Sequence, residues 1–208
     1  MLLGLALVLG ILVCLVILVR HPGEPRRASE QLPIIGPVAD FTLTNHFGAP
    51  VTLADLQGHV WVADIIFTRC AGPCPEMTRK MRQLQAALPL SSRARLVTLT
   101  TDADHDTPQV LARYAERYGA DPGRWSFLTG DKVAIANLAI DSLKLTAVEK
   151  APEDRTDPND LFVHSTIFVV VDKQGRLRGA FESVGEHLSW PEARQAILRA
   201  VATLEEES

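Results

Sequence analysis

Apolar and polar positions recur with two different periods along this chain, and these periods predict helices and strands in turn. The nearly continuous apolar run VWVADIIF, residues 60–67, is rich in Val and Ile and predicts a strand covered on both faces. Residues 75–88 then predict a helix, because apolar side chains recur on one stripe: Met77, Met81, Leu84 and Leu88. Such a stripe is typical of core packing, so the methionines are given no ligand role.

The next two elements have clear boundaries. The run ARLVTLT at 94–100 predicts a second strand. After it, Thr107 can cap a helix, Pro108 suits the first helical position, and Gly119 is a stop signal. A helix is therefore expected over VLARYAERY, the stretch that lies between this start and this stop.

Shorter patterns complete the series on both sides. Two β-like pieces at 40–44 and 50–56 predict an N-terminal hairpin that turns through 45–49. The C-terminal half predicts, in order, a strand at 125–130, a helix at 131–143, a polar surface loop at 149–160, a strand at 164–172, its hairpin partner at 177–183 and a helix at 190–204.

This order of elements predicts the fold class. Strands that alternate with helices and end in a β-hairpin plus a helix give an α/β fold, a three-layer sandwich. The order is that of a thioredoxin-like domain with an extra N-terminal β-hairpin, and we expect this domain to occupy residues 34–208.

The first nineteen residues form a separate segment. They contain no charged side chain, and a helix of that length reaches about 28 Å, close to the thickness of a bilayer core. A cleaved signal peptide fits less well, because no charged segment precedes the run and no A-x-A-like site follows it. We therefore expect one uncleaved transmembrane helix at 1–19, with Cys14 as an apolar residue inside it, and a Pro-rich charged linker at 20–33.

Composition and charge narrow the classes of partner. The 208 residues are 47% hydrophobic and 22% charged, which suits one globular domain plus a short extra segment. The formal net charge is −4, and the domain without anchor and linker stands at −5, because three basic and two acidic residues lie in the linker. An acidic domain gives no electrostatic support for a nucleic-acid partner.

The candidate chemistry lies in FTRCAGPCPEMT, residues 67–78, where three residues separate Cys70 from Cys74. Pro75 disfavours helical geometry at the residue before it, so we expect Cys74 at the helix N-cap, where the dipole favours a thiolate. A structural disulfide would close too small a loop to stabilise much. Redox chemistry and metal binding both remain open, although thioredoxin-type catalysts usually have two intervening residues.

A metal site needs a third ligand besides two thiolates. The best candidate is His164, which precedes the predicted strand STIFVVV and, in a thioredoxin-like sheet, would face the N-terminus of the first helix. Two thiolates and one imidazole form a soft ligand set that suits copper. The other histidines lie in the linker, turns or loops, and we expect them to be solvated: His21, His46, His59, His105 and His187.

At these residues the sequence resembles the Sco/SenC family, membrane-anchored copper proteins that help to assemble the copper centre of cytochrome c oxidase. FTRCAGPCP is similar to the family's F-T-x-C-P-x-x-C-P motif, TTDADHDTPQVLARYA to its D-P-x-x-D-T-P segment, and VHSTIFVVVDKQGRL to its D-H-S-T segment. The sequence departs from the family in four places: Ala71 replaces a proline, Pro73 is added, Ala103 follows Asp102 in place of proline, and Val163 precedes the histidine in place of aspartate.

The resemblance implies a function and a place in the cell. Cys70, Cys74 and His164 would be the copper ligands, and Asp102 would match an acidic position near the site. The chain would be a copper metallochaperone for a cytochrome c oxidase subunit or another copper protein. The alternative is a thiol-disulfide oxidoreductase, with the two cysteines as its redox-active pair, or a redox or copper sensor.

The resemblance also implies a single-pass protein of the cell membrane with its domain on the extracytoplasmic (periplasmic) side. Read literally, the positive-inside rule implies the opposite orientation, because Arg20, Arg26 and Arg27 all follow the apolar segment. The rule is statistical, and a large domain can be translocated despite flanking charge, so we follow the family.

Overall fold

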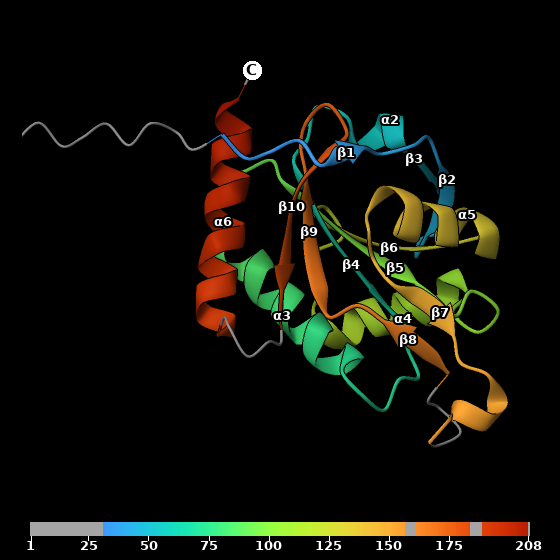
Figure 1. Ribbon diagram of the computed structural model, residues 1–208. Helices are drawn as coiled ribbons and strands as arrows, with labels where there is room; N and C mark the ends of the chain where they lie inside the picture. The colour runs from blue at the N-terminus through green and yellow to red at the C-terminus, as the bar shows by residue number, and fades with distance from the viewer. Residues whose placement is uncertain (1–30, 157–160, 184–188, 208) are drawn as a thin grey trace, which may run out of the picture. The chain divides into compact units, whose positions relative to one another are not determined.

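Figure 1 shows a computed structural model of the protein, which describes residues 31–156, 161–183 and 189–207. Residues Leu32–Ser208 form one compact unit. None of the helices in the described ranges combines the length and the apolar composition that a membrane span requires. The predicted anchor at 1–19 lies outside these ranges, as does the linker up to residue 30.

A mixed sheet forms the centre of the unit. In the described part of the chain it has eight strands in the order β1-β10-β9-β4-β5-β6-β2-β3. The strands are β1 (Gly36–Pro37), β2 (Thr42–Asn45), β3 (Pro50–Thr52), β4 (Trp61–Ile66), β5 (Arg95–Thr100), β6 (Trp125–Thr129), β9 (Ile167–Val171) and β10 (Arg176–Glu182).

The direction of the central strands positions the site. Strand β4 runs parallel to β5 over its whole length, with Trp61 opposite Arg95 and Ile66 opposite Thr100. Parallel strands end at the same edge of a sheet, so the loop after Ile66 and the loop after Thr100 lie next to each other. The first of these loops carries both cysteines, and the second carries the DTP segment.

Helices cover both faces of the sheet, which confirms the predicted three-layer α/β sandwich (Figure 1). The core on one face contains residues of α3 (Cys74–Ala87), α4 (Pro108–Tyr118) and α6 (Trp190–Glu206). The core on the other face contains residues of α2 (Leu53–Leu56), α5 (Lys132–Ala136) and the π-helix η1 (Asn137–Ser142). The predicted N-terminal hairpin is present as β2 and β3, paired antiparallel at the edge of the sheet.

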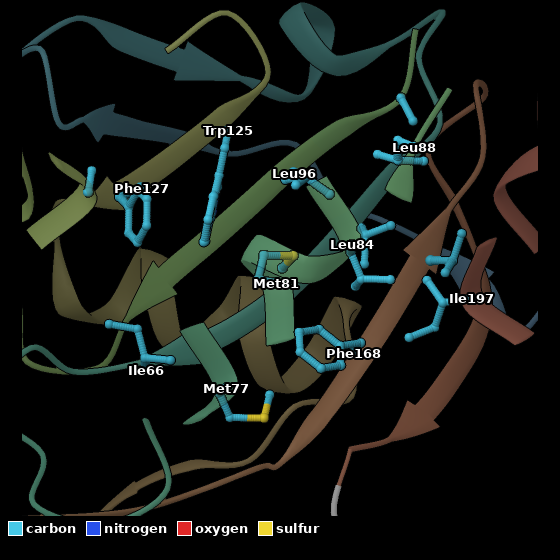
Figure 2. Close-up of a cluster of buried hydrophobic side chains, with 14 of the residues drawn as sticks. Ile66, Met77, Met81, Leu84, Leu88, Leu96, Trp125, Phe127, Phe168 and Ile197 are labelled. Carbon is cyan, nitrogen blue, oxygen red and sulfur yellow. The ribbon is translucent and has the colours of Figure 1, made fainter. Parts of the chain in front are cut away.

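The stripe predicted on α3 packs into the first of these cores. Met77, Met81 and Leu84 are at most 1% exposed. Figure 2 shows both methionine side chains within the apolar cluster that also contains Phe168 and Ile197. The assignment of the methionines to core packing is therefore confirmed.

The predicted boundaries of α4 are also confirmed. The Thr107 side chain accepts a hydrogen bond from the Val110 N–H, and Pro108 begins the helix. Gly119 ends it in the left-handed region at φ 66°, and its N–H donates to the Ala115 and Glu116 carbonyls. A glycine adopts this conformation without the steric cost that a Cβ would bring.

Two predicted elements differ from the structure. The strand expected at 50–56 stops at Thr52, because Thr52 and Asp55 form a capping box that begins the short helix α2. The helix expected at 131–143 begins at Lys132, because Asp131 is its N-cap, and it continues from Asn137 as a π-helix.

The strand expected at 164–172 is divided into two strands that belong to different sheets. Its main part is β9, whereas His164 ends β8 (Phe162–His164), which pairs with β7 (Ala147–Glu149) in a small second sheet. The segment 149–160, which was expected to be a surface loop, therefore contains the end of β7 and a 3-10 turn, η2 (Pro152–Asp154). Residues 157–160 are not among those that the structure describes.

A buried ion cluster joins the two ends of the compact unit. Arg178 of β10 is 3% exposed, and its Nη1 donates to Asp172 Oδ2 at 2.8 Å and to Glu207 Oε2 at 2.7 Å. Its Nη2 donates to the Leu32 carbonyl at 2.6 Å. One guanidinium thus holds the first and the last described parts of this unit against the sheet.

Candidate metal and thiol site

The two cysteines lie on a short loop between β4 and α3. Backbone hydrogen bonds give the loop its shape: the Cys70 N–H donates to the Phe67 carbonyl at 3.3 Å. Backbone groups also contact both sulfurs, because the Gly72 N–H lies 3.3 Å from Cys70 Sγ and the Phe67 N–H lies 3.4 Å from Cys74 Sγ. The Cys74 thiol also hydrogen-bonds with Cys70, so the two sulfurs are neighbours. No disulfide joins Cys70 to Cys74 in the structure.

The two thiols differ in their access to solvent. Cys74 is 0% exposed, and Cys70 is half-buried. Burial raises the pKa of the Cys74 thiol far above its ordinary range, and the hydrogen bond with Cys70 raises it further. The pair therefore offers one accessible sulfur and one sulfur that is held as a neutral thiol below it.

This arrangement corrects the prediction for Cys74. The N-cap position belongs to Pro73, and Cys74 is the first helical residue, with Pro75 following it inside the first turn. The expectation that the helix dipole favours a Cys74 thiolate is wrong, because the cost of removing the sulfur from water exceeds the modest stabilisation that a helix terminus provides.

The polar residue inside the apolar strand β4 is a buried aspartate that has hydrogen-bond partners on the next strand. Asp64 is 0% exposed, and Thr98 Oγ1 of β5 donates to its Oδ1 at 2.6 Å. Trp125 Nε1 in turn donates to Thr98 Oγ1 at 2.9 Å. The negative charge of Asp64 also contributes to the raised pKa of Cys74.

A second buried carboxylate, Asp106, fixes the start of the cysteine loop. Asp106 is 0% exposed and accepts hydrogen bonds from the Thr68 N–H at 3.0 Å, from the Thr68 hydroxyl, and from the Thr100 hydroxyl at 2.5 Å. Thr68 lies two residues before Cys70. Asp106 therefore connects the cysteine loop to the end of β5 from across the sheet edge.

Sequence reasoning missed this role of Asp106 and Thr68. The DTP segment was interpreted only through the helix start at Thr107 and Pro108. Local sequence signals do not reveal it, because Asp106 and Thr68 lie thirty-eight residues apart and an aspartate before a helix cap can equally be solvated.

Asp102, the acidic position expected near the site, lies on the same loop as Asp106. It is 4% exposed and accepts a hydrogen bond from Arg69 Nε at 2.7 Å. This bond raises the pKa of the Arg69 guanidinium. Asp102 thus steadies the residue that directly precedes Cys70.

The structure brings the backbone of His164 into the same neighbourhood. His164 ends β8 and pairs with Ala147 of β7. Two residues earlier, the Phe162 ring contacts the Phe67 ring with centroids 5.2 Å apart, and Phe67 is also the residue whose N–H reaches Cys74. The side chain of His164 lies outside what the structure describes, so its role as a ligand stays a prediction.

Other candidate ligands are placed as follows. Among the described side chains, no group of three His, Cys, Asp or Glu residues stands together as a metal site. The expectation that His46 is solvated is wrong, because it is 6% exposed and its Nδ1 accepts the Phe127 N–H at 3.2 Å. His105 is exposed, His59 Nδ1 lies 2.9 Å from the Arg93 carbonyl, and His21 and His187 lie outside the described residues.

The donor set nevertheless suits copper. Two adjacent sulfurs are soft ligands, and a cation beside the buried one would offset part of the charge that its thiolate carries. A half-buried partner sulfur leaves a side open to the solvent. A site with these properties can hold a soft metal ion or form a disulfide within the loop.

Comparison with known proteins identifies the group of chains to which these features belong. The model of the SCO1/SenC family matches residues 32–199. The SCO1 protein homolog of Bacillus subtilis (strain 168) is 34% identical over 154 residues, which cover 73% of this chain and 77% of that protein.

Solved structures agree with this match. BsSco, a member of the Sco family of cytochrome c oxidase assembly proteins with a disulfide switch, is 28% identical with a TM-score of 0.71, over 86% of this chain and 100% of that one. ScoI of Bradyrhizobium japonicum, solved with copper bound, has a TM-score of 0.64 at 24% identity, over 80% of this chain and 99% of that one. The second likeness shows the shared fold.

Proposed function

The chain belongs to the SCO1/SenC family, and from this premise we propose that it is a copper metallochaperone that acts in the assembly of the copper centre of cytochrome c oxidase. The observation that carries the proposal is the pair of neighbouring sulfurs of Cys70 and Cys74 at the end of the central sheet. Relatives solved with copper bound, and a relative from a family of oxidase assembly proteins, support it.

In this proposal copper is cargo, and the chain's own residues hold and release it. Cys70 and Cys74 bind the ion as thiolates, and His164 completes a trigonal site. Both thiols must lose their protons on binding, so the apparent affinity rises with pH. The half-buried Cys70 is the sulfur that an acceptor can approach, and the network around Asp106 keeps it in place during ligand exchange.

Titration of the full chain with Cu(I), kept reduced in a nonionic detergent, tests the proposal. We expect about one copper per chain, and loss of binding after oxidation of the cysteines or in Cys70→Ser, because thiolates are the ligands. Absence of copper binding by the reduced chain would sink the proposal. Rapid reduction of an unrelated disulfide substrate by the same sample would favour the thiol-disulfide oxidoreductase instead.

The third ligand is tested separately. His164→Ala should weaken copper binding strongly but leave the urea midpoint and the alkylation of Cys70 close to wild type, because two thiolates alone do not complete a trigonal site. His59→Ala is the matched control, since its ring lies against the Arg93 carbonyl. Unchanged copper affinity together with a large loss of stability would identify His164 as a structural histidine.

We further propose that residues 1–19 anchor the chain and that the domain lies outside the cytoplasm. The uncharged apolar run supports an anchor, and a compact unit beginning at Leu32 leaves room for a short linker. A reporter that is active only after export, fused behind Ser208, should be active. Activity of a cytoplasm-only reporter at the same place would restore the orientation implied by Arg20, Arg26 and Arg27.

A further inference from the structure

A small pocket opens directly beside the cysteine loop. Its volume is about 190 Å³, and its walls come from the residues before Cys70 and from α4. Three arginines line it: Arg69 from the loop, and Arg113 and Arg117 from the helix. We call this hollow the arginine pocket.

The charge of the arginine pocket is opposite to that of the domain, which stands at −5 without the anchor and the linker. Arg69 already donates its Nε to Asp102. Arg113 and Arg117 are exposed, and neither takes part in an ion pair or hydrogen bond among the described residues. The pocket therefore presents two exposed guanidinium groups without an ion-pair partner among the described residues, in a domain whose net charge is negative.

The spacing of these two arginines adds a second argument. They are four residues apart on α4, so they lie on the same face of the helix, where like charges destabilise the helix slightly. An anion between them would remove this repulsion. A guanidinium also matches a carboxylate in shape, because two parallel N–H groups can reach its two oxygens.

The pocket is lined by residues that directly precede the first cysteine. Thr68 and Arg69 line the pocket and are the two residues before Cys70, and consecutive Cα atoms are about 3.8 Å apart. On the other side, Tyr114 also lines the pocket, its hydroxyl lies 2.9 Å from Thr78 Oγ1, and Thr78 Oγ1 donates to the Cys74 carbonyl at 2.9 Å. The wall of the pocket is therefore continuous along the chain with Cys70 and is linked through Tyr114 and Thr78 to the backbone of Cys74.

We propose that the arginine pocket binds a carboxylate side chain from an acidic segment of the protein that receives copper from Cys70. This rests on the proposed function for the identity of the partner, although the binding of acidic side chains does not depend on it. Charge complementarity of this kind guides encounter and fixes orientation. A partner held in this way would present its own copper ligands to Cys70.

Binding of a fluorescein-labelled hexaglutamate peptide to the reduced full chain in nonionic detergent tests the inference by fluorescence anisotropy. We expect binding that weakens as salt is raised, and a dissociation constant increased about tenfold by Arg113→Gln combined with Arg117→Gln. The matched control combines Arg194→Gln with Arg199→Gln on α6, which removes the same charge elsewhere, and it should change binding less than about twofold.

Equal weakening by both double variants would overturn the inference, because it would show attraction to overall charge alone. Inorganic phosphate and glycerol phosphate, the soluble fragment of an anionic lipid, are added as competitors of the peptide. If either binds more strongly than the peptide does, the pocket is a phosphate site and the inference is wrong. Copper stoichiometry, measured in the same samples, should stay at wild type in the pocket variant. If the wild-type chain fails to bind copper, the proposed function is wrong. The peptide measurement still decides whether the arginine pocket binds carboxylates.

Discussion

Replacement of Asp106 by asparagine is the sharpest test of how the cysteine loop is held. The carboxylate is completely buried and accepts from the Thr68 N–H, the Thr68 hydroxyl and the Thr100 hydroxyl. Asparagine keeps the shape of the side chain but replaces one acceptor oxygen by an NH₂ group. The threonine hydroxyls can rotate to accept from it, whereas the Thr68 N–H cannot change its role.

The size of the effect follows from these contacts. Hydrogen bonds to a charged group contribute about 1.5–3 kcal/mol each, and the cost of burying the carboxylate offsets part of their sum. The loss of the charge and of one acceptor in Asp106→Asn should therefore lower the free energy of unfolding by about 2–3 kcal/mol. Asp106→Ala, which leaves all three donors without this acceptor, should lower it by about 3–5 kcal/mol.

Urea unfolding followed by tryptophan fluorescence measures the stability, and the rate of alkylation of Cys70 by iodoacetamide reports on the loop. We expect Asp106→Asn to lower the midpoint and to speed alkylation, because Thr68 is no longer fixed. The control is Asp104→Asn on the same loop, whose carboxylate is 76% exposed and pairs with Lys132, so its effect should stay within about 0.5 kcal/mol. If Asp106→Asn matches wild type in both measurements, the network does not hold the loop.

Three further predictions concern the two cysteines, the end of α4 and the Asp172–Arg178 ion pair. Iodoacetamide should modify Cys70 well before Cys74, as peptide mass spectrometry can show, because Cys74 is buried and the pKa of its thiol is raised; the reverse order would contradict the structure. Gly119→Ala should lower the urea stability by about 1 kcal/mol, because φ is 66° there, and an unchanged midpoint would argue against this conformation. Burial opposes the ionisation of Asp172, but the hydrogen bond from Arg178 holds the pKa of Asp172 below its ordinary value, so its contribution is present above about pH 4 and is lost as the pH falls through the lower folded pKa. Asp172→Asn should therefore remove part of the acid-induced loss of stability between pH 7 and pH 2, and a variant with the wild-type pH profile would refute this.

The parts of the fold that sequence predicts well are those set by local pattern. The run at 60–67 and the stripe on α3 are periodic over enough residues to define both the element and its buried face. The boundaries of α4 depend on Thr107 and Gly119, whose capping roles are local chemistry. These elements needed no knowledge of their neighbours.

The predictions that differ from the structure depend on contacts between distant residues or on competing local signals. The sequence pattern places His164 in the strand that follows it. In the structure His164 belongs to β8 and pairs with Ala147 of β7, seventeen residues earlier in the chain. Asp106 meets Thr68 across thirty-eight residues, a contact that no helix or strand period reveals. In the 50–56 segment the capping box of Thr52 and Asp55 outweighed the alternating pattern.

For the site itself, the spacing of Cys70 and Cys74 predicts that the sulfurs meet, and the structure brings them together. The burial of Cys74 could not be predicted from that spacing. It depends on the apolar cluster to which both Cys74 and the neighbouring Phe67 belong. The helix terminus was visible in the sequence, but the larger opposing effect of burial was not.

This burial has different consequences for the two chemistries open to a cysteine pair. In thiol-disulfide exchange, Cys74 would have to ionise inside the apolar cluster in order to resolve a mixed disulfide at Cys70, and its raised pKa makes that thiolate scarce near neutral pH. Binding of Cu(I) also removes the proton, but the cation stays beside the sulfur and offsets part of the charge that burial disfavours. The same desolvation that suppresses the bare thiolate therefore costs the copper-bound thiolate much less. A buried second sulfur below an accessible first one thus favours holding a soft cation over rapid turnover of disulfides.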